Sequence, residues 1–216
     1  MLNVEEAKKL YYQQWQDMPG KTEDWQNSIG EQTHPARRII AEIVQQNGKS
    51  VLEVACGIGV DYPRYKQLGI KYFGVDITPK FIEEAKRHGV PCKIASALAL
   101  PFENGSFDSV YCKDLLLHLP IGDYKIVLKE MTRVSRGPVI VADHIWEQRT
   151  RYLLCEQYTS KDAGELIFFN NVYNQKDVQD YMESLGYTMK IHLTGSASIG
   201  VNVVQQNIVT EFKKCP

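Results

Sequence analysis

The chain has 216 residues, of which 44% are hydrophobic and 24% are charged, and its formal net charge is −1. This composition is typical of one globular domain, and the near-neutral charge argues against a protein that binds nucleic acid mainly through its phosphates. There is no run of 18 apolar residues and the first residues are charged, so we expect neither a membrane span nor a secretory leader. Five cysteines without a C-x-x-C pair indicate a reducing compartment, and we expect a cytoplasmic protein.

Two helices and then an alternation of strands and helices are predicted in chain order. The first helix covers residues 5–16, and the second starts near Pro35 and stops at Asn47-Gly48. Five strands are predicted next, at 51–54, 72–76, 92–95, 107–112 and 139–143, with helices at 79–88 and 123–134. Such alternation is typical of βαβ units around a parallel sheet.

The last third of the chain departs from this alternation. Residues 149–173 form an irregular, aromatic segment, and a helix is predicted at 176–185. Two further strands, at 187–193 and 201–212, are joined by so short a connection that they should pair antiparallel. We expect one domain in four parts: an N-terminal helical cap (1–48), a cofactor-binding core (49–145), a substrate-covering insertion (146–174) and a last helix with the C-terminal strand pair (175–216).

A glycine-rich turn, Gly57-Ile58-Gly59, follows the first strand of the alternation. Ligands of open α/β sheets bind at the carboxyl ends of the strands, where glycine lets them approach the backbone. Asp76 closes the second strand, 17 positions after Gly59, where a carboxylate can accept hydrogen bonds from both hydroxyls of a ribose. Thr78 is the better candidate to cap the next helix, which leaves Asp76 to bind a nucleoside cofactor.

The turn also distinguishes between nucleoside cofactors. A dinucleotide fingerprint needs a third glycine, and residues 60–63 (VDYP) supply none. The P-loop pattern G-x-x-x-x-G-K-[ST] does not occur either. These observations count against a nicotinamide or nucleoside-triphosphate site.

Three segments, taken in order, resemble the class I S-adenosylmethionine-dependent methyltransferases. Residues 51–59 (VLEVACGIG) look like the family's first motif, residues 95–110 are similar to its segment from the adenine-contacting turn to the fourth strand, and residues 115–120 (LLLHLP) resemble its L-x-H-L-P. The resemblance implies a Rossmann-like, doubly wound α/β fold. Its mostly parallel seven-stranded sheet would have an antiparallel last strand and helices on both faces. The similarity is greatest to the small-molecule branch that includes quinone-biosynthesis enzymes.

The resemblance implies S-adenosyl-L-methionine as the cofactor and S-adenosyl-L-homocysteine as the product. Glu53 would help to hold the methionine ammonium, and Asp76 would bind the ribose. The family often has Asp where this chain has Ser96, so the Ser96 hydroxyl or the nearby backbone would contact the adenine instead. The residues expected to bind the cofactor are Glu53, Ala55, Gly57, Gly59, Asp76, Ile77, Ser96, Ala97, Leu98 and Lys113.

In-line displacement at a sulfonium methyl needs no metal and no covalent intermediate, because holding the nucleophile on the axis of the breaking bond can supply most of the catalysis. No metal site is therefore expected. An acceptor that must lose a proton needs a base. The candidates at the carboxyl edge of the sheet are His118, Asp143 and His144. His118 lies among leucines, so a packed structural histidine is the alternative for that residue.

Aromatic residues outside the core pattern are candidates to cover this edge and to contact the acceptor. They are Tyr11, Tyr12, Trp15, Trp146, Phe168 and Tyr173. Aromatic walls would suit a flat ring or, through cation–π attraction, a cationic amine. Hydrophobic packing is the alternative for each ring.

We therefore expect methyl transfer from S-adenosylmethionine to an O, N or C nucleophile of a small molecule. Nothing resembling N-P-P-Y follows the fourth strand and no basic arm is visible, so no nucleic-acid partner is expected. Neither is a membrane partner, and the protein should be a monomer or a homodimer. Two alternatives stay open: a nicotinamide-dependent oxidoreductase on a similar fold, and a non-catalytic domain that binds S-adenosylmethionine.

Overall fold

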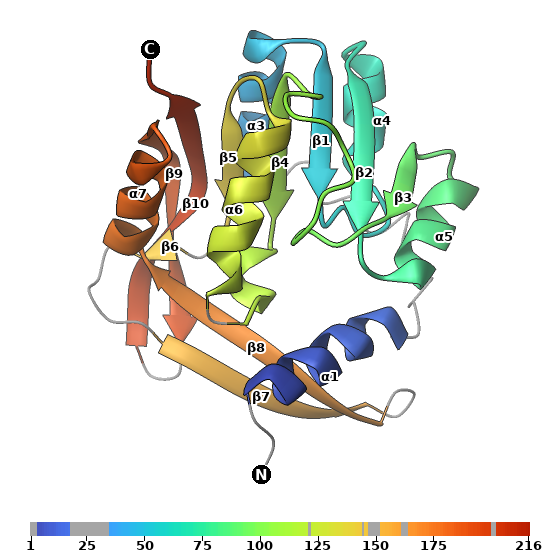
Figure 1. Ribbon diagram of the computed structural model, residues 1–216, viewed down its shortest axis with the longest axis vertical. Helices are drawn as coiled ribbons and strands as arrows, with labels where there is room; N and C mark the ends of the chain where they lie inside the picture. The colour runs from blue at the N-terminus through green and yellow to red at the C-terminus, as the bar shows by residue number, and fades with distance from the viewer. Residues whose placement is uncertain are drawn as a thin grey trace.

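A computed structural model describes residues 4–17, 35–120, 122–143, 145–146, 152–160, 164–199 and 202–216 (Figure 1). Within these ranges ten strands form one sheet, in the order β3-β2-β1-β4-β5-β10-β6-β8-β7, and β9 pairs with β10. The central strands are β1 (Ser50–Val54), β2 (Lys71–Asp76), β3 (Cys92–Ile94), β4 (Ser109–Lys113) and β5 (Val139–Ala142). These five strands pair parallel with one another. The strand order reverses between β1 and β4, where a doubly wound sheet opens a crevice for its ligand.

The expected fold class is confirmed, since the seven predicted strands are all present. The last two are β9 (Tyr187–Ile199) and β10 (Asn202–Lys214), which pair antiparallel with each other, and β10 also pairs antiparallel with β5. The sheet continues beyond them through β6 (Ile145–Trp146), β8 (Gly164–Asn174) and β7 (Tyr152–Ser160).

The expectation of irregular structure at 149–173 is wrong for the described parts of that segment. Strands β7 and β8 pair antiparallel along their length, from Tyr152 with Val172 to Ser160 with Gly164. The segment is rich in aromatic and β-branched residues, which favour strands, but it lacks the strict alternation that identifies a half-buried strand in a sequence. This long hairpin crosses the lower part of Figure 1, where β8 contacts helix α1 (Val4–Asp17).

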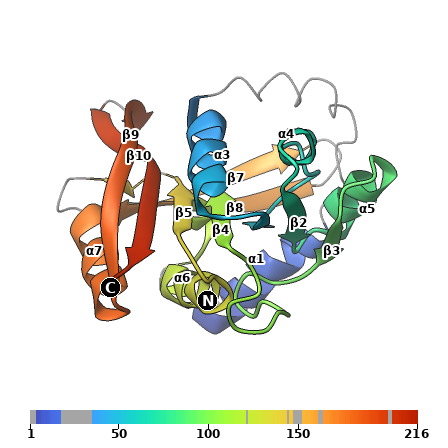
Figure 2. The ribbon, with the colours of Figure 1, turned by 90° about the horizontal axis from the view of Figure 1, so that it is seen from above.

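Helices cover both faces of the central sheet (Figure 2). One face is covered by α3 (Pro35–Asn47), α4 (Tyr62–Gln67) and α5 (Pro79–Arg87), and the other by α6 (Asp123–Val134) and α7 (Gln175–Ser184). Successive residues of β1 alternate between the two cores, with Val51 in the first and Leu52 and Val54 in the second. This alternation points Glu53 toward the face of α3 and α4. No helix in the described ranges is long and apolar enough to cross a bilayer.

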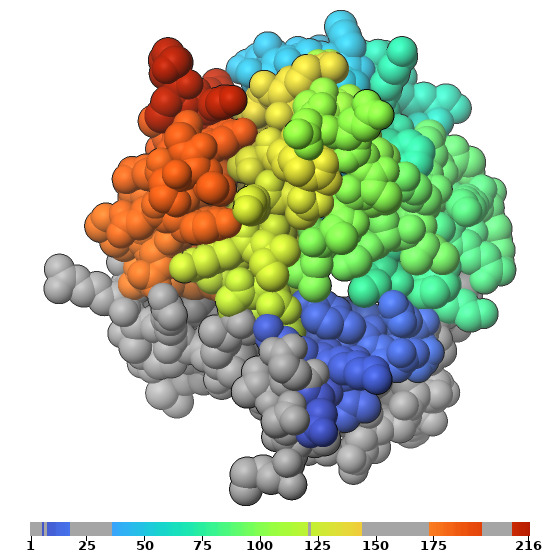
Figure 3. Space-filling view, in the orientation of Figure 1, coloured from blue at the N-terminus to red at the C-terminus, as the bar shows by residue number. Residues whose placement is uncertain are grey.

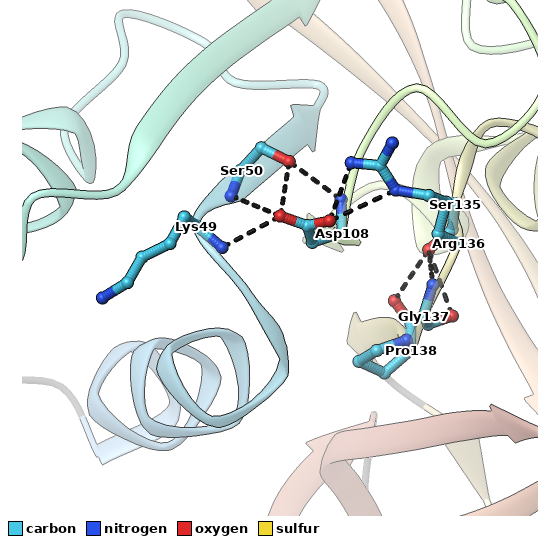
Figure 4. A network of polar contacts seen from close by, with 7 residues as sticks. All are labelled: Lys49, Ser50, Asp108, Ser135, Arg136, Gly137 and Pro138. Atoms are coloured by element: carbon cyan, nitrogen blue, oxygen red, sulfur yellow. Dashed lines mark hydrogen bonds and ion pairs between the residues drawn. The ribbon is translucent and has the colours of Figure 1, made fainter.

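Asp108 ties together the amino ends of β1, β4 and β5 (Figure 4). Its carboxylate accepts hydrogen bonds from the amides of Lys49 at 2.9 Å and Ser50 at 3.0 Å, and from the Arg136 guanidinium at 2.7 Å. Partial burial alone would raise the pKa of this carboxyl, but the Lys49 amide and Arg136 outweigh burial and lower it to about 2. The group lies at the opposite end of the strands from the crevice, so its role is to stabilise the sheet.

We expect Asp108→Asn to lower the free energy of unfolding by about 1–3 kcal/mol at pH 7, because the charge-assisted hydrogen bonds are lost. An unfolded aspartate titrates near pH 4, well above the folded value. The stabilisation is therefore complete above about pH 4 and is lost as the pH falls toward 2. Urea unfolding at a series of pH values measures both effects. As a control, Asp180→Asn removes an exposed carboxylate paired with Lys176 and should change stability by less than about 0.5 kcal/mol; equal losses in the two variants would contradict the prediction.

Candidate active site

Two adjoining cavities lie at the carboxyl ends of β1, β2 and β4. The first has a volume of about 330 Å³ and is lined by Tyr11, Tyr12, Trp15, Ala55, Gly57, Asp76, Ile77, Thr78, Phe81, Asp114, Leu115, His118 and Leu119. The second has a volume of about 360 Å³ and is lined by Arg37, Glu53, Ala55, Cys56, Gly57, Ile58, Val60, Phe81, Lys113 and Asp114. Their shared walls place them side by side. In Figure 3 the surface is hollowed where α1, in blue, meets the green segments.

The two glycines of the turn after β1, Gly57 and Gly59, have different surroundings. Both have left-handed backbone conformations, with φ of +53° at Gly57 and +74° at Gly59. A Cβ atom added to Gly57 would meet no atom within 4 Å, and Gly57 lines both cavities. A Cβ atom added to Gly59 would lie 2.7 Å from Val90, so Gly59 allows close packing and lines neither cavity. Only Gly57 therefore leaves room for a ligand.

Asp76 lies at the end of β2 on the wall of the first cavity, and only 7% of it is exposed. Its two carboxylate oxygens accept hydrogen bonds from the amides of Gly57 at 2.9 Å and Thr78 at 2.8 Å. Burial raises the pKa of this carboxyl, and the two amides act in the opposite direction. Each oxygen still has capacity for a second hydrogen bond, as two ribose hydroxyls require.

The idea that Thr78 caps α5 and leaves Asp76 without a capping role needs correction. Thr78 occupies the N-cap position, but its side chain accepts no capping hydrogen bond. The carboxylate of Asp76 instead accepts a hydrogen bond from the amide of Thr78, the residue just before the helix. Asp76 therefore holds the turn after β1 and the start of α5 together while it faces the cavity.

Glu53 belongs to a buried network behind the second cavity. It accepts a hydrogen bond from the Tyr72 hydroxyl, while Arg37 from α3 forms an ion pair with Asp61. The Tyr111 hydroxyl donates to Asp61 at 3.4 Å. Burial, followed by the negative charge of Asp61, raises the pKa of Glu53 to about 8, against the opposing effects of Tyr72 and Arg37. The second cavity is thus bordered by the Glu53 carboxyl group, whose ionised form a cationic ligand would stabilise.

Asp114, just after β4, lies where the two cavities meet. Its backbone is left-handed, with φ of +53°, and its amide donates to the carbonyl of Ala142 at 2.9 Å. The carboxylate forms an ion pair with Lys113, which lines the second cavity. Left-handed conformations of residues other than glycine are uncommon and concentrate at functional sites.

Helix α1 closes the first cavity with three aromatic side chains, Tyr11, Tyr12 and Trp15. The Tyr11 hydroxyl donates to the carbonyl of His118, and the Tyr12 hydroxyl donates to Asp123 at 2.7 Å. The rings of Trp15 and His118 lie 5.7 Å apart. The first cavity is therefore enclosed on one side by a helix attached to the segment that follows β4.

Two residues expected to contact the acceptor instead hold the turn that carries His118. The carboxylate of Asp143 accepts hydrogen bonds from the amides of Leu116 and Leu117, and the Tyr173 hydroxyl donates to the carbonyl of Leu116 at 2.6 Å. Neither residue is among the described lining of the two cavities. The geometry gives both a positioning role.

The turn after β3 carries the residues expected to contact adenine. Ser96 accepts a hydrogen bond from the Leu98 amide at 3.2 Å, and Ser96, Ala97 and Leu98 do not line the cavities as described. The turn lies beside Asp76, because the amide of Ala95 donates to the Asp76 carbonyl. His144 and the side chains of Trp146 and Phe168 lie outside the described residues.

Arg37 was not among the predicted site residues, although its place in the sequence indicates that it is buried. Arg37 shares the apolar face of α3 with Ile40 and Val44 and is 7% exposed, whereas the Arg38 side chain points to solvent. A charged residue on the apolar face of an amphipathic helix needs a buried partner. Phe81 was not predicted either, and the first turn of α5 brings it to both cavities.

Residues 52–140 match a protein family described as a methyltransferase domain. The chain is 36% identical over 110 residues to the 2-methyl-6-phytyl-1,4-hydroquinone methyltransferase of Synechocystis, an alignment that covers 47% of this chain and 33% of that protein. It is 34% identical over 80 residues to the ubiquinone biosynthesis O-methyltransferase of Xanthomonas oryzae, which covers 34% of each. The chain thus spans about a third of the length of these relatives.

Solved structures share the fold at low sequence identity. A methyltransferase from Methanosarcina mazei superimposes with a TM-score of 0.64 at 15% identity, over 82% of this chain and 98% of that one. The magnesium protoporphyrin IX methyltransferase of Synechocystis, with S-adenosylhomocysteine bound, gives a TM-score of 0.60 at 15% identity over 96% and 95% of the two chains. In its sheet order and its crevice the chain has the fold of these solved structures, and residues 52–140 are similar to a methyltransferase domain.

Proposed function

We propose that the protein transfers the methyl group of S-adenosylmethionine to an O, N or C nucleophile of a small molecule. The observation that carries this proposal is the pair of adjoining cavities at the strand-order reversal. One is lined by Asp76, a carboxylate that could bind a ribose, and the other is lined by charged groups of both signs. The names of two relatives, a 2-methyl-6-phytyl-1,4-hydroquinone methyltransferase and a ubiquinone biosynthesis O-methyltransferase, support a small-molecule acceptor.

The residues present fit the cofactor. Asp76 would accept hydrogen bonds from the ribose hydroxyls, and the open side of Gly57 leaves room for the chain between ribose and amino acid. In the second cavity Glu53 would pair with the α-ammonium, and Lys113 would pair with the α-carboxylate. The turn at Ser96 to Leu98, beside Asp76, remains the proposed contact for adenine. When bound, the cofactor supplies a methyl group attached to a sulfonium sulfur, and transfer of this methyl group leaves a neutral thioether.

The chain's own residues would orient the acceptor and exclude water. Helix α1 closes the first cavity, and His118 lines it within reach of the aromatic wall. Asp143 would act on His118 indirectly, by fixing the amides of the turn that carries it. His118 is therefore the preferred candidate for contact with the acceptor, and His144 remains a candidate from the sequence.

Calorimetric titration with S-adenosylmethionine, S-adenosylhomocysteine and NAD tests the cofactor. We expect both sulfur compounds to bind and NAD not to bind; NAD binding without a response to the sulfur compounds would instead support the oxidoreductase alternative. A screen for transfer of a tritiated methyl group to small molecules distinguishes an enzyme from a non-catalytic binding domain. A cytoplasmic location, a monomer or homodimer, and the division into cap, core, insertion and C-terminal part remain predictions of the sequence.

Binding of S-adenosylmethionine should release protons below pH 8. Glu53 is protonated there in the free protein, since its pKa is about 8, and an ammonium group beside it favours the carboxylate. The affinity for S-adenosylmethionine should therefore rise as the pH increases from about 6 to 8. Near pH 6, binding of one cofactor molecule should release up to about one proton. Calorimetry in two buffers of different ionisation enthalpy measures the released protons. Glu53→Gln can keep the hydrogen bond from Tyr72 and should abolish the release, so an unchanged release in this variant would show that another group titrates.

A further inference from the structure

We propose that Asp114 binds the methyl acceptor and that the acceptor is an arylalkylamine, held as an ammonium ion between this carboxylate and the aromatic residues of α1. The inference rests on the proposed function and adds the chemical class of its substrate. It comes from three features of the first cavity: its charge, its aromatic wall and the position of Asp114 between the two cavities.

The charge of the first cavity is negative. Among its described lining residues the acidic side chains are Asp76 and Asp114, and none is Lys or Arg. Lys8 of α1 forms an ion pair with Asp123 at 2.7 Å, and neither residue is in the described lining of the first cavity. An anionic acceptor such as a carboxylate would therefore be repelled, whereas an ammonium group would be attracted. Asp114 is paired with Lys113; if a carboxylate of the cofactor took this lysine, a neutral quinol would offer Asp114 no cation in its place, whereas an ammonium group would.

The aromatic wall fits the same cation. Tyr11, Tyr12 and Trp15 of α1 and Phe81 of α5 face the first cavity. The Tyr12 hydroxyl donates to Asp123, so its ring is held in place. Aromatic faces attract an ammonium ion through the ring quadrupole, most strongly where water is excluded. The same rings would stack on the flat part of an arylalkylamine.

Asp114 is placed at the reacting centre. If the ribose binds at Asp76 in one cavity and the amino acid at Glu53 in the other, the atoms that join them would lie where the cavities meet. Asp114 lines that junction, and its left-handed backbone is fixed by the hydrogen bond to Ala142. Its present partner, Lys113, also lines the aminoacyl cavity, where a carboxylate ligand would compete for it.

The chemical step balances without a further reactant. The ammonium gives one proton to Asp114, and the amine nitrogen then uses its freed electron pair to form a bond to the methyl carbon. The carbon–sulfur bond breaks with its electron pair remaining on sulfur, which becomes a thioether. The product is a methylated ammonium, and the proton on Asp114 passes to solvent, so one proton is released per turnover.

The test uses the full chain and Asp114→Asn, which suits the left-handed backbone because Asn adopts it readily. On protein saturated with S-adenosylhomocysteine, calorimetry should show that 2-phenylethylamine binds at least about tenfold more tightly than 2-phenylethanol, and that Asp114→Asn removes the difference. Tritiated methyl groups should be transferred to 2-phenylethylamine, tyramine or tryptamine. Asp180→Asn, at an exposed Lys–Asp pair, is the matched control and should behave as wild type.

Three results would overturn the proposal. They are equal binding of the amine and the alcohol, methyl transfer that occurs only to phenols or carboxylic acids, and an Asp114→Asn variant that loses affinity for S-adenosylmethionine but keeps its preference for the amine. The last result would place Asp114 against the sulfonium rather than the acceptor. Failure of the wild type to bind either sulfur compound would instead refute the proposed function, which the cofactor titrations report separately from the amine measurements.

Discussion

Asp76→Ala should weaken binding of S-adenosylmethionine by about 100-fold or more. Two hydrogen bonds from ribose hydroxyls to a charged carboxylate contribute about 1.5–3 kcal/mol each, and every 1.4 kcal/mol corresponds to about tenfold in affinity. The variant also loses the hydrogen bonds to the amides of Gly57 and Thr78, which hold the turn after β1 against α5. Titration calorimetry measures the loss, and circular dichroism shows whether the variant is folded.

The matched control for Asp76→Ala is Asp108→Asn. Asp108 also accepts hydrogen bonds from two backbone amides, but at the opposite end of the strands. The two variants should therefore separate stability from binding: Asp108→Asn destabilises the fold and keeps the affinity, whereas Asp76→Ala reduces the affinity of folded protein. If Asp76→Ala binds the cofactor as tightly as wild type does, the ribose does not lie at the end of β2.

Arg37→Leu should lower the free energy of unfolding by about 3–5 kcal/mol at pH 7, because removal of one partner leaves a buried charge uncompensated. Arg37 is 7% exposed and its partner Asp61 is 3% exposed. The loss should grow above pH 8. There the wild-type Glu53 ionises close to Arg37, whereas in the variant Glu53 must stay protonated or ionise without that cation.

The neighbouring Arg38 provides the control for Arg37→Leu. Its side chain is 69% exposed and reaches Glu42 at 3.7 Å on the surface of the same helix. Arg38→Leu should change the free energy of unfolding by less than about 1 kcal/mol at any of these pH values. Guanidinium unfolding of both variants measures the difference, and equal losses would mean that helix α3, rather than the buried ion pair, accounts for the effect.

The strands of the core could be predicted because each is a short β-branched run between turn signals, and because a parallel sheet buries such runs on both faces. The roles of Gly57 and Asp76 could also be predicted, since a glycine-rich turn and a carboxylate at the end of a strand are recognised from a few neighbouring residues. By contrast, strands β7 and β8 escaped prediction because their pairing is with each other and with β6, which the local pattern does not reveal.

The sequence by itself determined the fold class, the number of core strands and the carboxylate proposed for the ribose, because each depends on the residues within one element or one turn. Only the tertiary structure showed that Arg37 meets Asp61 beside Glu53, that α1 closes the first cavity, and that Asp114 lies where the two cavities join. These features depend on contacts between elements far apart in the chain. Burial and charge around a side chain arise from such contacts, and they set its pKa and the ligands that it can bind.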